Sequence, residues 1–240
     1  MKLYIAADTK ENMLLGKRLG AKAILTNAKI VLDLYGENMT LQESTERMLQ
    51  ESGLPVFQSI HGESVKDIID KGLSVCKAAG KLNKAEVGLK IIASRDGFQA
   101  IKVLSEQGIK CIVTGLYTVH QAMVAAQVKA FAISPFIARG KEAGLDMEEC
   151  IKAIRAIYDR MQNPPEILAA SIRTLKDVDL AARAGADGVA ISVALIKEMI
   201  DCEYSRQTED AFGYSFARIK GEDVSYLHLP KKNDTEQTDE

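Results

Sequence analysis

Short apolar runs alternate along the chain with longer segments in which apolar side chains recur at helical spacing. One pattern occurs three times, a helix end followed by a glycine and an apolar strand, over Arg18–Asn27, Glu106–Gly115 and Arg183–Ser192. Glycine readily adopts the left-handed backbone conformation that ends a helix. A strand that is apolar on both faces is typical of a parallel sheet covered by helices, so the pattern predicts βα units.

Eight strands are predicted when the remaining apolar runs are added to these three. The additional strands are Leu3–Ala6, Pro55–Ile60, Val87–Ile92, Ala130–Ser134 and Ile167–Ser171, and the helical patterns between strands include Glu63–Ala79, Gly97–Gln107, Thr118–Gln127, Met147–Met161 and Leu175–Ala184. Eight units in 240 residues give about 30 residues to each unit, the size of one βα repeat. We therefore predict an α/β fold, a (β/α)8 TIM barrel.

The alternative fold is an open doubly wound sheet. Such a sheet commonly carries a glycine-rich phosphate loop at the point where the strand order reverses. The chain contains neither a GxGxxG nor a Walker A sequence, so the barrel is favoured.

The end of the chain departs from the repeat. Residues 208–219 are predicted to form an extra C-terminal helix that carries Phe212, Tyr214 and Phe216. After Pro230 the sequence is wholly polar, which is typical of a disordered terminus. The predicted organisation is a barrel over residues 1–204, a C-terminal helical extension over 205–228 and a disordered tail over 229–240.

Composition and charge narrow the classes of function. Hydrophobic residues make up 47% of the chain, and no apolar run is long enough to span a bilayer. The net charge is −2 without a long basic run, so neither nucleic acid nor a membrane is expected as a partner. The four cysteines and three histidines are scattered, which predicts reduced thiols and no metal site. The N-terminal Met-Lys-Leu-Tyr-Ile sequence predicts a strand rather than a signal peptide, so we expect a cytoplasmic protein.

Lys90 is the residue whose surroundings most strongly indicate chemistry. It lies within the apolar run Val87–Ile92, and the active site of a (β/α)8 barrel lies at the carboxyl ends of its strands. Burial disfavours the ammonium form, and a neutral lysine attacks ketones to form a Schiff base. The other interpretation is a lysine at a strand end whose ammonium reaches water, and the residues alone leave both open.

Three further polar residues lie in or after predicted strands. Gln58 and Thr114 interrupt apolar strands and can hold a water for proton transfer near an imine, or else satisfy neighbouring polar groups. Asn27 can bind a sugar hydroxyl or cap the helix that begins after it.

Two arginines and a serine indicate an anion site. Arg139, Ser171 and Arg173 lie at predicted loop starts, where two guanidinium groups and a hydroxyl can bind a phosphate. The alternative is surface arginines paired with carboxylates. The Ser-x-Arg after the seventh strand favours phosphate, because that corner of a (β/α)8 barrel often binds one.

Six segments in order resemble the small transaldolase family, which includes the fructose-6-phosphate aldolases. The resemblance runs from Met1 to about Phe216. The segments are Met1–Tyr4, Leu25–Ile30, Leu89–Ile91 with Asp96–Lys102, Val113–Tyr117, Ile133–Arg139 and Ile167–Thr174.

The resemblance implies a barrel that carries out aldol chemistry through a lysine Schiff base, with no metal and no organic cofactor. It implies a role for each candidate residue: Lys90 as the Schiff-base lysine, Gln58 and Thr114 at the catalytic water, Asn27 on donor hydroxyls, Phe136 in the substrate site, and Arg139, Ser171 and Arg173 on phosphate. It also implies a homo-oligomer formed through the C-terminal helix.

The chain departs from the family pattern at the first strand. The family carries an aspartate there that acts as the general base on the C4 hydroxyl, and the ungapped match in this chain is Ala6. Asp8 fits if the strand is two residues longer, which keeps the side chain on the same face. Phe136 stands where the aldolases tend to carry tyrosine and favours transfer, whereas Gln58 stands where larger transaldolases carry glutamate and favours the aldolases.

The predicted function is therefore a transaldolase that transfers a dihydroxyacetone unit between sugar phosphates. The first alternative is fructose-6-phosphate aldolase-type cleavage, in which dihydroxyacetone is released. The second is a catalytically impaired barrel that binds sugar phosphates, which Ala6 motivates. A third is a Schiff-base aldolase that uses a different donor.

Overall fold

The computed structural model describes residues 1–6, 9–79 and 87–219. Its strands are β1 (Lys2–Ala6), β2 (Ile24–Leu25), β3 (Val56–Ile60), β4 (Val87–Ile92), β5 (Cys111–Leu116), β6 (Ala132–Pro135), β7 (Glu166–Ala169) and β8 (Gly188–Ser192). Its helices are α1 (Lys10–Arg18), α2 (Ala28–Tyr35), α3 (Leu41–Ser52), α4 (Val65–Ala79), α5 (Arg95–Glu106), α6 (Val119–Gln127), α7 (Ile137–Glu142), α8 (Met147–Tyr158), α9 (Leu175–Arg183), α10 (Val193–Ile200) and α11 (Glu203–Phe216).

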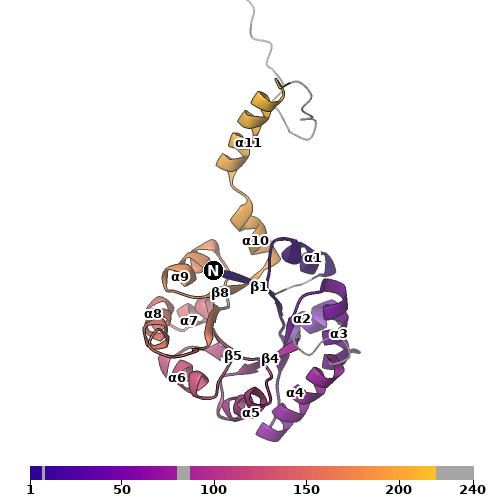
Figure 1. Cartoon of the computed structure of the whole chain (residues 1–240), viewed down its shortest axis with the longest axis vertical. Coiled ribbons are helices and arrows are strands. Elements are labelled where there is room, and N and C mark those ends of the chain that lie inside the picture. Colours follow the sequence, from indigo (N-terminus) through magenta and orange to yellow (C-terminus); the bar gives the residue numbers. More distant parts are fainter. Residues whose placement is uncertain (7–8, 80–86, 220–240) are drawn as a thin grey trace, which may run out of the picture. The chain divides into compact units, whose positions relative to one another are not determined.

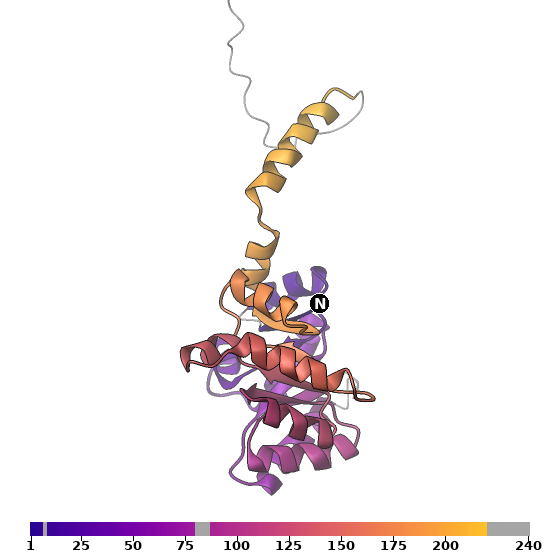
Figure 2. The same cartoon turned by 90° about the vertical axis from the view of Figure 1, so that its left-hand side faces the viewer.

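The strands form a closed parallel barrel in chain order (Figure 1). Closure comes from the pairing of β8 with β1, in which Lys2–Ala6 run alongside Gly188–Ser192. Helices surround the ring of strands (Figure 1), and the view turned by 90° shows α8 and α9 on the side that faces the viewer (Figure 2). The prediction of a (β/α)8 barrel is confirmed, and the open-sheet alternative is wrong.

The glycines of the repeated pattern end helices as the sequence predicts. Gly20, Gly108 and Gly185 follow α1, α5 and α9 with φ values of 87°, 78° and 88°. A side chain at these positions is strained, because L-residues with a Cβ rarely adopt positive φ. Each glycine therefore turns the chain from a helix into the next strand.

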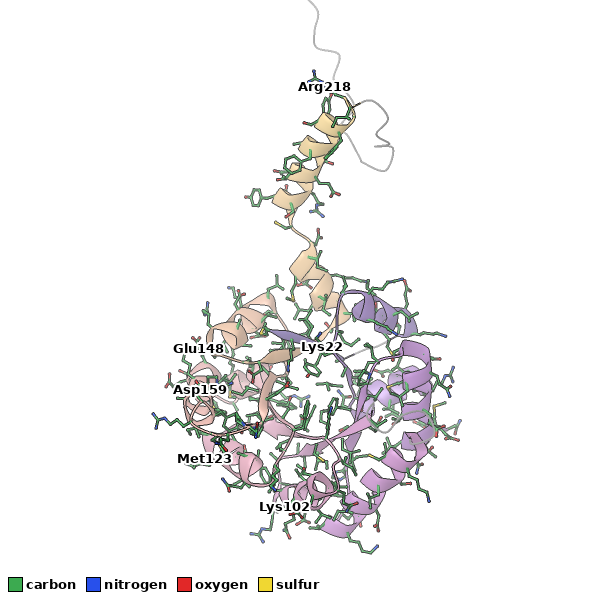
Figure 3. The ribbon with its side chains drawn as sticks, viewed as in Figure 1. Lys22, Lys102, Met123, Glu148, Asp159 and Arg218 are labelled. Carbon is green, nitrogen blue, oxygen red and sulfur yellow. The ribbon has the colours of Figure 1, made fainter. Side chains whose placement is uncertain are left out.

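Two apolar layers lie on opposite faces of the barrel wall. A small cluster holds only residues from the strands and their flanks, among them Tyr4, Phe57, Ile112 and Leu168, and forms the inner layer. The larger cluster includes helix residues such as Ile101 and lies between strands and helices. Side chains fill the ring that the ribbon leaves open (Figure 3). Side chains alternate between the two faces along a strand. Once one residue of a strand is assigned to the inner layer, the residues two positions before and after it also face inward, and its direct neighbours face the helices.

The C-terminal part forms a separate unit. Contacts divide the chain into residues 1–196 and 197–240. Within the second unit α11 runs from Glu203 to Phe216, where the sequence predicts a helix over 208–219, so the helix begins five residues earlier. The remainder of the predicted extension and the predicted tail, residues 220–240, lie outside the described residues. Among the described residues no helix has the length and apolar character needed to cross a membrane.

Candidate active site

Lys90 lies on the inner face of the barrel, near the carboxyl end of β4. Its Cα pairs with Ser59 on β3 and with Ile112 on β5, and Ile112 belongs to the inner layer. Lys90 is 9% exposed, and its amine has no hydrogen-bond or ion-pair partner among the described residues. Burial, followed by the positive charge of Arg139, lowers the pKa of Lys90 from 10.5 to about 8. A part of this amine is therefore neutral near pH 7, as attack on a carbonyl requires.

Hydroxyl groups surround Lys90 on the inner face. Thr114 lies two residues beyond Ile112 on β5, and its register partner on β6 is Ser134. The oxygens Oγ1 of Thr114 and Oγ of Ser134 are buried and have no hydrogen-bond partner in the described chain. Ser59, two residues after the inner-layer Phe57, faces the same side as Lys90. These three hydroxyls can hold a water or a substrate oxygen beside the amine.

Gln58 does not lie with Lys90. Its register partner is Leu89, which belongs to the layer between strands and helices, so its side chain points away from the inner face. The carboxamide is fully buried, where its Oε1 accepts a hydrogen bond from Thr45 of α3 at 3.1 Å and its Nε2 donates to the carbonyl of Ser59 at 3.3 Å. The prediction that Gln58 holds a water beside Lys90 is therefore corrected, and Ser59 is the residue of β3 that faces the amine.

Ala6 places a methyl group on the inner face at the end of the first strand. It lies two residues after the inner-layer Tyr4 and pairs with Ser192 of β8, so a methyl group faces the inside of the barrel here. Asp8, the predicted replacement for the missing aspartate, lies outside the described residues. Its role as the general base stays a prediction.

Asn27 caps the N-terminus of α2. Its Oδ1 accepts a hydrogen bond from the backbone nitrogen of Ile30 at 2.9 Å, which satisfies one of the free donors of the first turn. The cap position fixes the side chain at the carboxyl end of β2, with Nδ2 making no hydrogen bond among the described residues. A contact with donor hydroxyls therefore uses the amide nitrogen, and it stays a prediction.

Phe136 packs with Tyr117 and Arg139 at the carboxyl end of the barrel. It lies two residues after Ser134 and pairs with Ala170 after β7, so it continues the inner face. The Tyr117 ring meets it edge to face, with centroids 5.9 Å apart, and the Arg139 guanidinium lies 5.1 Å from the centre of the Phe136 ring. Ile92 at the end of β4 is 45% exposed, which shows that this end of the barrel is open to solvent.

Ser171 has a strained backbone. Its φ is 54°, in the left-handed region that a residue other than glycine rarely occupies. The conformation turns its Oγ toward α7, where it accepts a hydrogen bond from the backbone nitrogen of Arg139 at 3.3 Å, while its carbonyl accepts from Ala138. Backbone strain of this kind is often found at binding sites. The hydrogen bond also links Ser171 to Arg139, two of the three predicted phosphate residues.

The two predicted phosphate arginines differ in their partners. The Arg173 guanidinium forms an ion pair with both carboxylate oxygens of Glu142 on α7. The guanidinium of Arg139 contacts Phe136 and has no carboxylate partner among the described residues. The alternative interpretation, an arginine paired with a carboxylate, thus describes Arg173, whereas Arg139 is available for an anion.

Three residues of this region were not predicted from the sequence. Ser134 is a polar residue late in an apolar strand, as Thr114 is, so it could have been predicted on the same grounds. Ser59 directly follows Gln58, and only the register with β4 decides which of the two faces Lys90. Glu142 follows Arg139 by three residues on one helix, a spacing that places both on one side.

No metal-binding group is formed by the described residues. Within residues 1–6, 9–79 and 87–219, no cluster of three or more His, Cys, Asp and Glu side chains is suited to hold an ion. The expectation of a reaction without metal or organic cofactor stays a prediction.

Comparison with known proteins places this barrel in a family. A family model described as Transaldolase/Fructose-6-phosphate aldolase matches residues 8–229. The chain belongs to this family. The family resemblance is therefore confirmed over residues 8–229, which include five of the six segments, and with it an enzyme family of the aldolase and transferase type.

Relatives from several bacteria agree with the family. A protein of Ruegeria pomeroyi named probable transaldolase is 35% identical over 173 residues, which cover 72% of this chain and 76% of the relative. A probable transaldolase of Cereibacter sphaeroides is 32% identical and covers 81% of this chain and 85% of its own length. One of Bartonella tribocorum is 31% identical over 74% of this chain and 78% of the relative.

Solved structures share the fold at low sequence identity. A putative phosphonomutase from Burkholderia cenocepacia superposes with a TM-score of 0.58 at 14% identity, over 89% of this chain and 93% of that one. A thiamine phosphate pyrophosphorylase from Pyrococcus furiosus gives 0.53 at 17% identity, over 79% and 85%. At such identities the likeness concerns the barrel alone.

Proposed function

We propose that this chain is a transaldolase that carries a dihydroxyacetone unit from a ketose phosphate to an aldose phosphate as a Schiff base on Lys90. The observation that carries the proposal is the buried Lys90 amine, whose pKa of about 8 leaves it partly neutral at the carboxyl end of the barrel. A solvated lysine with a pKa near 10.4 is almost wholly protonated at neutral pH and is a poor nucleophile.

In the proposed reaction the Lys90 amine adds to the C2 carbonyl of the donor, and loss of water from the carbinolamine gives an iminium ion. A base then takes the proton of the C4 hydroxyl, the C3–C4 bond breaks, and the aldose phosphate leaves. The electron pair of that bond remains on the lysine adduct as an enamine. C3 of the enamine attacks the aldehyde carbon of the acceptor, and water hydrolyses the resulting imine and frees Lys90.

The hydroxyls of Ser59, Thr114 and Ser134 support the steps in which water leaves and returns. They lie on the inner face with Lys90, and two of them are buried without protein partners in the described chain. Each can donate and accept, so a water bound there can lose a proton at one stage and gain one at another. Asp8 is the proposed base on the C4 hydroxyl, by resemblance to the family.

Arg139 and Ser171 support binding of the donor phosphate, with Arg173 as a third group. Arg139 has two effects in this proposal, because its charge attracts the phosphate and also lowers the pKa of Lys90. Phosphate bound at Arg139 screens the lysine from that charge, so the substrate itself alters the protonation of the nucleophile.

Release of dihydroxyacetone is the second candidate function, and Tyr117 favours it. An aldolase must protonate the enamine, and Phe136 has no proton to give. The Tyr117 ring meets the Phe136 ring edge to face, which brings a phenol next to Phe136. A phenol beside Phe136 can supply the proton through a water.

Borohydride trapping with fructose 6-phosphate tests the proposed chemistry. Reduction of the imine leaves a stable adduct that intact-mass measurement detects, and Lys90→Ala is the control. We expect a sugar-derived adduct in the wild type and none in the variant. Addition of erythrose 4-phosphate then distinguishes the two functions, because transfer yields a new ketose phosphate and release yields free dihydroxyacetone. The absence of any adduct contradicts the proposal and favours the impaired barrel that Ala6 motivates.

Self-association through α11 is part of the proposal. Tyr204, Phe212 and Phe216 on this helix are 78%, 61% and 50% exposed in the single chain. Large aromatic side chains gathered on one short helix are typical of a surface that becomes buried in an assembly.

A further inference from the structure

The chain's own carboxylates occupy the anion-binding groups that follow β7. Arg173 directs its guanidinium to Glu142 of α7, and the backbone nitrogens of Arg173 and Thr174 donate to Asp177 Oδ2 at 3.0 and 3.1 Å. The loop after the seventh strand and the helix that follows it often bind phosphate in (β/α)8 barrels. A phosphate that binds here therefore competes with groups of the protein.

The two carboxylates are held very differently. Asp177 has a side chain that is 3% exposed, forms a capping box with Thr174 and pairs with Lys141 at 2.9 Å. Burial acts to raise the pKa of Asp177, but the hydrogen bonds from Lys141 and from the backbone outweigh it and leave the pKa lowered. Asp177 is thus a fixed part of the fold.

The Glu142 carboxylate, by contrast, can be displaced from Arg173. Its side chain is 56% exposed, and Arg173 is its hydrogen-bonding and ion-pair partner in the described chain. Exposed pairs of this kind contribute little, because water and salt screen both charges. A phosphate dianion accepts more hydrogen bonds than a carboxylate and carries more charge, so it can replace Glu142 on the Arg173 guanidinium.

The short helix α7 brings Glu142 and Arg139 to one side. Residues three apart on a helix are neighbours, and Arg139 is linked to the β7–α9 loop by the hydrogen bond from its backbone to Ser171. A phosphate gripped by Arg139 and Ser171 consequently lies on the same side of α7 as the Glu142 carboxylate. That carboxylate repels the phosphate as well as occupying Arg173.

We propose that Glu142 limits the affinity of the site for phosphorylated substrates, because it holds Arg173 in the free protein and a phosphate must displace it. This inference rests on the proposed function for the identity of the ligand. It implies that the strength of phosphate binding is set by one exposed carboxylate, which takes no part in the chemistry at Lys90.

Calorimetric titration with inorganic phosphate tests the inference without any aldol chemistry. Glu142→Gln should bind phosphate about 3- to 10-fold more tightly than the wild type, because one competing and repelling charge is removed. Arg173→Gln should bind it more weakly, and in the Arg173→Gln background Glu142→Gln should have a smaller effect. Glu106→Gln is the matched control, since Glu106 is also exposed and paired, at 2.7 Å, with Lys102 on the outer rim of the barrel (Figure 3).

Trapping on Lys90 distinguishes specificity from a general effect. In Glu142→Gln the fructose 6-phosphate concentration that gives half-maximal trapping should fall by a similar factor, and that for unphosphorylated dihydroxyacetone should not change. Equal phosphate affinity in wild type and Glu142→Gln, or no phosphate binding by either, overturns the inference. Loss of trapping with intact phosphate binding overturns the proposed function and leaves the role of Glu142 standing.

Discussion

Thr114 on β5 and Ser134 on β6 are register partners, and both hydroxyls are buried without a hydrogen-bond partner in the described chain. Buried polar groups nearly always have partners, and one that lacks them costs about 1–3 kcal/mol. Two such groups side by side on the face that carries Lys90 are expected where a fold sacrifices stability to keep polar atoms ready for a ligand.

Thr114→Val should therefore stabilise the protein and impair the chemistry. Valine keeps the shape and removes the unsatisfied hydroxyl, so the free energy of unfolding in urea should rise by about 1 kcal/mol. Trapping of fructose 6-phosphate on Lys90 should slow by about tenfold or more, because a group that positions the water is lost. Thr45→Val is the control, since the Thr45 hydroxyl is bonded to Gln58. It should destabilise the protein and leave the trapping rate unchanged. A Thr114→Val protein that is less stable and traps normally would assign this hydroxyl to the fold.

Lys90→Met should stabilise the protein at neutral pH. The folded-state pKa of about 8 lies below the ordinary value of 10.5, so folding below pH 8 buries a charged amine at a cost. Methionine removes that cost, and the free energy of unfolding should rise by roughly 2–3 kcal/mol at pH 7. The difference in unfolding free energy between variant and wild type should be full below about pH 8 and shrink as the pH rises from 8 to 10.5. It should vanish above 10.5, where the amine is neutral in both the folded and the unfolded state. Urea denaturation at pH 7 and pH 10, at one protein concentration, measures it, and a difference independent of pH would show that burial of the charge is not its origin.

Truncation before the aromatic residues of α11 should reduce the size of the assembly. A chain that ends at Thr208 lacks Phe212 and Phe216, whose exposed area the assembly would bury. Light scattering should give a smaller mass for this chain and for Phe212→Ser, and an unaltered mass for Gln207→Ala, a change at a polar position of the same helix. An unaltered mass in all three proteins would remove α11 from the interface.

The barrel was predictable from sequence because its signals are local. Gly20, Gly108 and Gly185 each end a helix, and the apolar strands that follow repeat at regular spacing. Lys90 was predictable for a similar reason, since one charge inside an apolar strand is unusual wherever the strand lies. The phosphate residues were predicted together, but the pairing of Arg173 with Glu142 was not, because α7 and the loop after β7 are far apart in the sequence.

The sequence alone could not decide whether Gln58 or its neighbour Ser59 faces the inside of the barrel. Adjacent polar residues on a strand face opposite sides, and which one faces inward depends on the pairing of β3 with β4. Gln58 was predicted because it is a polar residue within an apolar strand and because of the family resemblance. The register instead gives Ser59 to the inner face and uses the glutamine amide to join β3 to α3.

Substitutions at these neighbouring positions should consequently have opposite effects. Gln58→Ala removes a fully buried side chain and its hydrogen bond to Thr45, so the free energy of unfolding should fall by about 2–3 kcal/mol. Its trapping rate with saturating fructose 6-phosphate, measured well below the unfolding transition, should stay within about twofold of the wild type. Ser59→Ala should change stability by no more than about 0.5 kcal/mol and slow trapping by roughly tenfold, because the hydroxyl beside Lys90 is lost. Denaturation curves measure the stability of the two variants, and intact-mass time courses measure their trapping rates. Together they show which of the two residues acts beside Lys90 and which stabilises the fold. Slow trapping in Gln58→Ala with a normal rate in Ser59→Ala would return the catalytic role to Gln58 and require β3 to be shifted by one residue against β4.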